Sequence, residues 1–153
     1  MDYIEATRLI NSINSQRGKD FEQLVSTVFA AERGLHLQSS LSVPIGRPAK
    51  RHNFDLGSLE PAVVVECKNL TWTVSNRIPS AKLTALREAV FYLRLAPPEF
   101  RRILAMKRHT HPDREESLAE YFVRLNAFCL DDVEVVEIDE DGQLRVLVPM
   151  NLG

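Results

Sequence analysis

The sequence predicts an α/β fold in which helices flank a mixed sheet, and three observations favour this class. Segments with helical apolar spacing alternate with short β-branched runs, in the order α-α-β-β-β-α-β-α-β-β. The chain has 153 residues, which is the size of one domain. No internal repeat, linker or low-complexity segment divides it. We therefore expect a single domain over 1–153.

Two helices are expected first, over about 3–15 and about 18–32. In the second of these, apolar side chains recur every three or four positions, which is the spacing of one buried helix face. These residues are Phe21, Leu24, Val25, Val28 and Phe29. Gly34 follows as a natural helix end.

Three strands are expected next, over about 35–43, 53–59 and 62–68. The first two are separated by a loop rich in proline and glycine at 44–48, and the last two by a turn at Glu60-Pro61.

The remaining elements alternate between helix and strand until a final hairpin. The segment 70–79 is polar and irregular, and Ser80 is the expected N-cap of a helix that reaches about Leu95. The expected elements beyond it are a strand at 101–107, a helix at about 113–129 and strands at 133–138 and 144–148. The Asp141-Gly142 pair between those two strands is a strong hairpin signal.

Composition limits the classes of protein that this chain can represent. Its 2 cysteines, Cys67 and Cys129, are too few for a disulfide framework. There is no apolar run of about 20 residues, so no membrane span is expected. The N-terminus lacks the basic start and apolar stretch of a signal peptide. We therefore expect a cytoplasmic protein with no membrane association.

Charge is distributed unevenly along the chain although the net charge is only −2. Residues 1–109 hold 16 Lys and Arg against 10 Asp and Glu, whereas residues 110–153 hold 3 against 11. A basic first part favours binding of a polyanion, because neutralised phosphates supply most of the affinity for nucleic acid. The alternative is an uneven spread of solvated charges.

The pattern that points to chemistry is Asp55, ten residues, then Glu66-Cys67-Lys68 at the end of the apolar strand 62–68. Side chains alternate along a strand, so Glu66 and Lys68 share one face and Cys67 points to the other. Two carboxylates can hold a hard divalent cation such as Mg²⁺, and a nearby lysine can orient or deprotonate a water molecule. The alternative is a salt bridge at the strand end, which contributes little.

This spacing resembles the PD-(D/E)xK nuclease superfamily, with Asp55, Glu66 and Lys68 at the motif positions and Phe54 in place of the proline. The resemblance implies a restriction-endonuclease-like core over about 18–108, with an N-terminal helical extension and a C-terminal helix plus hairpin. It also implies that the backbone carbonyl of Cys67 is a metal ligand. An acid from the first helix often joins the site, and Glu22 resembles it. The alternative for Glu22 is a solvated helix residue.

Candidate nucleic-acid-binding residues lie on both sides of this motif: Arg47, Lys50, Arg51, Trp72 and Lys82. Arg47, Lys50 and Arg51, which precede Asp55, are expected in a loop. They either contact phosphate or form a solvated hairpin tip. Trp72 can stack on a base or wedge into a duplex, but a core or dimer-interface role is at least as well supported. Lys82 in the first turn of its helix can reach toward substrate.

The function expected from these observations is metal-dependent hydrolysis of nucleic-acid phosphodiester bonds, with DNA before RNA as substrate. The cofactor would be Mg²⁺, with Mn²⁺ as a substitute. The alternative is a non-catalytic module on the same fold that binds nucleic acid or a protein partner. Because the chain is short for an enzyme with its own specificity domain, we expect a homodimer or a partner subunit.

Overall fold

The structure, a computed structural model, describes residues 1–150 as an α/β fold with a six-stranded mixed sheet. The strand order follows the chain, β1-β2-β3-β4-β5-β6. The α/β class predicted from the sequence is therefore confirmed. The elements are α1 (Tyr3–Arg33), β1 (Gln38–Ile45), β2 (Lys50–Leu59), β3 (Ala62–Lys68), α2 (Ser80–Arg94), β4 (Arg101–Lys107), α3 (Leu118–Asn126), a short 3₁₀ helix (Ala127–Cys129), β5 (Glu134–Ile138) and β6 (Leu144–Val148).

The sheet combines an antiparallel hairpin region with a parallel centre. Strands β1, β2 and β3 pair antiparallel, β3, β4 and β5 pair parallel, and β6 returns antiparallel beside β5. Helices α2 and α3 make the two crossovers that parallel pairing requires. The carboxyl ends of the three parallel strands therefore share one edge of the sheet, and Glu66 and Lys68 lie at that edge.

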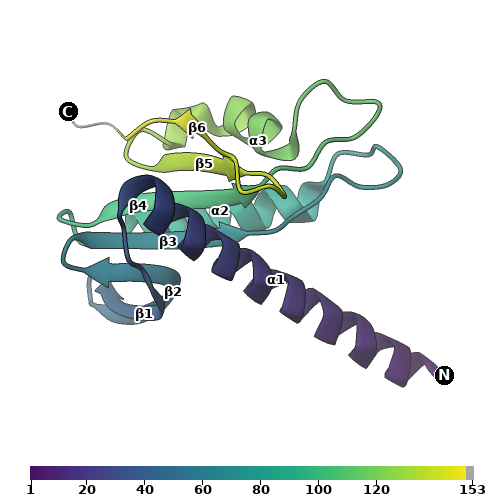
Figure 1. The fold of residues 1–153 in the computed structure, drawn as a ribbon, viewed down its shortest axis with the longest axis horizontal. Coiled ribbons are helices and arrows are strands. Elements are labelled where there is room, and N and C mark those ends of the chain that lie inside the picture. Colours follow the sequence, from purple (N-terminus) through teal and green to yellow (C-terminus); the bar gives the residue numbers. More distant parts are fainter. Residues whose placement is uncertain (151–153) are drawn as a thin grey trace.

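Helices cover both faces of the sheet, and each face has its own core (Figure 1). The C-terminal half of α1 packs on one face, where Phe21, Val25 and Phe29 meet Val63 and Val65 of β3. Helices α2 and α3 pack on the opposite face around Val64, Leu104 and Val135. Strand β3 is buried on both faces, which accounts for its unbroken run of valines.

The two N-terminal helices predicted from the sequence are one helix of 31 residues. It begins with a capping box between Asp2 and Glu5 and ends at Gly34, which adopts the left-handed conformation with φ 61°. The predicted gap between about 15 and 18 lies inside this helix, and so does Gly18, where a glycine costs about 1 kcal/mol relative to alanine and does not stop the helix.

Other boundaries also differ from the prediction. Strand β1 runs from Gln38 to Ile45 rather than over about 35–43. Strand β2 begins at Lys50, so Lys50 and Arg51 belong to a strand rather than to a loop. Helix α3 begins only at Leu118, because Ser117 forms the capping box with Glu120. Ser80 is the first residue of α2 and not its cap, since the N-cap position is Pro79 and no side chain caps the helix. The final hairpin lies where it was predicted.

None of the helices within residues 1–150 combines the length and the apolar character needed to cross a membrane.

Candidate active site

Asp55 lies where strand β2 bends between the two cores. Phe54 packs in the core under α2, whereas Leu56 packs in the core under α1. Residues two apart on a regular strand share one face, so the backbone must twist at Asp55. The pairing with β1 is regular at Phe54 and Leu56 but omits Asp55, and Ser40 on β1 has a positive φ of 58°. This irregularity turns the Asp55 side chain toward β3.

Asp55 and Cys67 meet where β2 and β3 separate. The ladder between these strands reaches only to Leu56 and Val65. Beyond it, the Asp55 carboxylate accepts a hydrogen bond of 2.8 Å from the backbone N–H of Cys67. The N–H and C=O of one strand residue point to the same neighbour, so the Cys67 carbonyl faces β2 as well. The Cys67 side chain packs against the core under α1, and burial raises the pKa of its thiol.

Glu66 is a buried carboxyl group, 7% exposed, beside a second carboxylate. Burial, the nearby charge of Asp55 and a hydrogen bond with that side chain together raise its pKa to about 8. The Lys68 ammonium opposes this shift. Glu66 therefore carries a proton at neutral pH unless a cation replaces it. Lys68 itself is half-buried and lies close enough to Glu66 to influence its titration.

His52 contacts Glu66 directly, a role that the sequence did not reveal. Its Nε2 lies 3.0 Å from Oε1 of Glu66. The imidazole is stacked on Tyr92 of α2, with centroids 4.2 Å apart, and meets the edge of Phe54. Burial lowers the pKa of His52 while that of Glu66 is raised, so the contact is a hydrogen bond between neutral groups rather than an ion pair. Only the bend at Asp55 brings His52 to Glu66, and the apolar periodicity of the strand does not signal that contact.

Glu22 lies on α1, close enough to Asp55 for the two charges to interact. Burial and the charge of Asp55 raise its pKa, and Lys19 lowers it. Glu22 and Lys19 also line a cavity of about 390 Å³ together with Leu56. The structure therefore brings Glu22 into the electrostatic field of Asp55, as a half-buried rather than a fully solvated residue.

The donor set at this site suits a hard divalent cation. Among residues 1–150, no three His, Cys, Asp or Glu side chains form a ready group around one ion, so Glu22 does not complete a third side-chain ligand. The two carboxylates of Asp55 and Glu66 and the Cys67 carbonyl are oxygen donors, which Mg²⁺ and Mn²⁺ prefer. Two adjacent carboxylates also repel one another, and a cation between them removes that repulsion.

Three of the candidate nucleic-acid-binding residues gather beside His52. Arg47 lies in the turn between β1 and β2, and Lys50 and Arg51 begin β2. All three are exposed and line a cavity of about 380 Å³ that His52 and Tyr92 also line. No salt bridge within the described part of the chain involves any of the three.

Trp72 and Lys82 have structural contacts instead. Trp72 is 2% exposed, and its ring packs against Tyr121 and under the guanidinium of Arg114. A buried indole cannot stack on a base, so the prediction of nucleic-acid binding by Trp72 is wrong and its alternative, a core role, holds. The ammonium of Lys82 donates hydrogen bonds to the carbonyl and hydroxyl oxygens of Thr71, which ties α2 to the preceding loop.

Comparison of this chain with protein-family models, with curated proteins and with solved structures gives no match.

Proposed function

We propose that this protein is a divalent-metal-dependent phosphodiester hydrolase that acts on nucleic acid, with DNA preferred to RNA. The observation that carries the proposal is the adjacent pair of carboxyl groups formed by the half-buried Asp55 and the buried Glu66. Within the described residues no arginine or lysine forms a salt bridge with either one. A buried acid without a cationic partner is costly, and such groups gather at functional sites.

Each residue has a distinct role in the proposed reaction. Asp55, Glu66 and the Cys67 carbonyl would hold one Mg²⁺, which supplies charge stabilisation for the phosphate and the leaving oxygen. Lys68, beside Glu66 on the same strand, orients the attacking water or accepts its proton. Glu22 positions water on the α1 side of Asp55. Burial of the site strengthens each of these electrostatic interactions.

The order of the elements supports a restriction-endonuclease-like core. A helix carrying Glu22 precedes an antiparallel hairpin with Asp55 at its bend, and the next strand carries Glu66 and Lys68. A helix and a parallel strand then follow. The exposed cations at Arg47, Lys50 and Arg51 support a polyanionic substrate, because cations that are not neutralised within the protein attract phosphate.

A second candidate function is a binding module on the same fold that holds nucleic acid or a protein partner without cleavage. One observation favours it: Asp55 and Glu66 each already have a hydrogen-bond partner, the Cys67 N–H and His52. A protein without catalytic activity would need such contacts to tolerate buried acids.

A cleavage assay separates the two functions. Purified protein is incubated with duplex, branched and single-stranded DNA and with RNA, in the presence of Mg²⁺, Mn²⁺ or EDTA. We expect cleavage that requires metal, and loss of about 10²-fold or more in rate for Lys68→Ala, since general acid–base groups contribute at least that much. Asp55→Ala and Glu66→Gln should be inactive.

Lys107→Ala is the matched control, because Lys107 is a half-buried lysine at the end of the neighbouring strand β4. It should retain wild-type activity. Wild-type protein that binds one of these substrates but cleaves none, with either metal, identifies the protein as the binding module.

A further inference from the structure

The cavity beside His52 combines cations with two aromatic rings that are stacked on each other. Arg47, Lys50 and Arg51 line one part of its wall. His52 and Tyr92 line another, with their rings nearly parallel at an interplanar angle of 9°. Ile45 and Leu95 complete an apolar side. Its volume of about 380 Å³ falls within the range of small-molecule sites, roughly 300–1,000 Å³.

We propose that this cavity binds one unpaired nucleotide of the substrate, with the phosphate on the three cations and the base on the outer side of the stacked His52–Tyr92 pair. Cations recognise the phosphate, and an aromatic face stacks on any base without regard to sequence. The proposal rests on the proposed nuclease function and specifies the substrate class as nucleic acid with an unpaired base. A fully paired base is already stacked, and a few kcal/mol are needed to extrude it.

His52 links this cavity to the candidate active site. It lines the cavity and at the same time lies 3.0 Å from Glu66. A nucleotide held against His52 therefore lies one side chain away from the carboxyl pair, which places the adjacent phosphodiester near the metal site. Tyr92 supports the imidazole from α2 and is a positioning residue as well as a stacking surface.

The test measures binding in EDTA, so that it does not depend on cleavage. Fluorescence anisotropy compares a fully paired DNA duplex with the same duplex carrying one unpaired nucleotide. We expect tighter binding of the second, and a loss of about fivefold or more of that preference in Tyr92→Leu, since base–aromatic stacking contributes about 1–3 kcal/mol. Tyr92→Phe keeps the ring and should keep the preference.

Two controls complete the design. Phe128→Leu removes an aromatic ring that is 83% exposed and does not line the cavity, and should change nothing. Arg87→Ala removes an exposed cation from α2, the helix that carries Tyr92. It should weaken binding less than Arg51→Ala does. Equal affinity for the two duplexes, or a preference that survives in Tyr92→Leu, overturns the proposal. If the preference depends on Tyr92 but the protein cleaves none of the substrates, nucleotide binding by the cavity is supported and the proposed nuclease function is refuted.

Discussion

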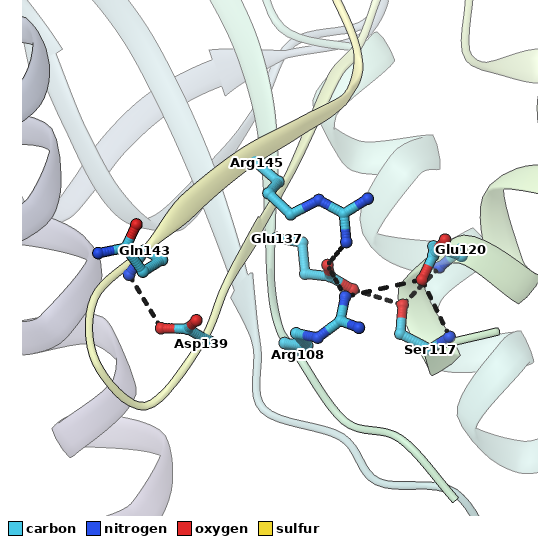
Figure 2. Close-up of polar contacts among 7 residues, drawn as sticks. All are labelled: Arg108, Ser117, Glu120, Glu137, Asp139, Gln143 and Arg145. Atoms are coloured by element: carbon cyan, nitrogen blue, oxygen red, sulfur yellow. Dashed lines mark hydrogen bonds and ion pairs between the residues drawn. The ribbon is translucent and has the colours of Figure 1, made fainter. Parts of the chain in front are cut away.

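Two buried glutamates, Glu137 and Glu66, stand in opposite electrostatic environments. Glu137 is 1% exposed, and its Oε1 lies 2.8 Å from Arg108 and 3.4 Å from Arg145. Its other oxygen accepts a hydrogen bond from the hydroxyl of Ser117 (Figure 2). Every oxygen of Glu137 therefore has a donor, and two of the donors carry positive charge.

Glu66 has no such compensation. Its contacts are a neutral imidazole and the carboxylate of Asp55, and its pKa is raised to about 8. Both glutamates are buried in the same sheet, so burial alone does not distinguish them. The difference teaches that the partners of a buried acid, more than its burial, indicate whether the fold uses it for cohesion or leaves it available to a cation.

The largest effect on stability is expected from removing Glu137, the glutamate whose charge is compensated by arginines. Glu137→Ala leaves the Ser117 hydroxyl without its acceptor and leaves Arg108 with only the more distant Glu120, 3.7 Å away. Removal of one member of a buried ion pair costs about 3–5 kcal/mol. For a chain of this size that corresponds to a fall in melting temperature of roughly 6–20 °C. Thermal or urea unfolding measures it. Glu140→Ala, at an exposed position of the adjacent turn, should be neutral, and a cost below about 1 kcal/mol for Glu137→Ala would contradict a cohesive role.

Glu66→Gln should stabilise the protein, whereas Glu137→Ala destabilises it, and the size of the stabilisation should depend strongly on pH. The pKa of Glu66 is 4.5 when unperturbed and about 8 in the folded protein. Between these values the folded state holds a proton that the unfolded state has lost, so wild-type stability falls as pH rises through that window. Without metal, Glu66→Gln should match the wild type near pH 4 and exceed it above pH 8, by on the order of 1–4 kcal/mol. Paired unfolding curves across pH measure this difference, and a constant difference would refute the assignment.

Divalent metal should restore stability to the wild type where the Glu66 charge is costly. A cation that binds only the folded state adds about 2.7 kcal/mol at a hundredfold excess over its dissociation constant. Because Glu66 must lose its proton to bind, the effect of Mg²⁺ or Mn²⁺ should be larger above pH 8 than at pH 6. Thermal melts with EDTA as reference measure it. Asp55→Ala should abolish the shift and Glu137→Gln should not, and an equal shift in all three proteins would remove the metal site.

Sequence reasoning located the acids of the candidate site but could not separate these two glutamates. Both follow buried valines on a strand, as Val65-Glu66 and Val136-Glu137. The arginines that compensate Glu137 are 29 residues before it and 8 residues after it. Arg108 directly follows β4, and Arg145 lies on β6. Such contacts depend on which strands are neighbours, and alternation along one strand does not contain that information.

The limits of the fold prediction have similar physical causes. Periodicity predicted the strands and the α/β class, since it follows from one-sided or two-sided burial of each element. It divided α1 between about 15 and 18, because the residues before Phe21 pack in neither core and have no buried face for periodicity to detect. It missed the bend at Asp55, which requires the pairing of three strands, and therefore missed the contact of His52 with Glu66.

The smallest effect is expected from replacing one of the two arginines that compensate Glu137, and it shows how much each arginine contributes to stability. Arg145 is 54% exposed and 3.4 Å from Glu137, whereas Arg108 is 34% exposed and 2.8 Å away. Solvent screens the first pair more strongly and its geometry is weaker, so Arg145→Ala should cost about 0.2–1 kcal/mol, the range of exposed ion pairs. Arg108→Ala should cost more, because it leaves the buried carboxylate with only a distant cation. Double-mutant cycles with Glu137→Ala measure both coupling energies, and a coupling through Arg145 equal to that through Arg108 would show that the two arginines share the buried charge evenly.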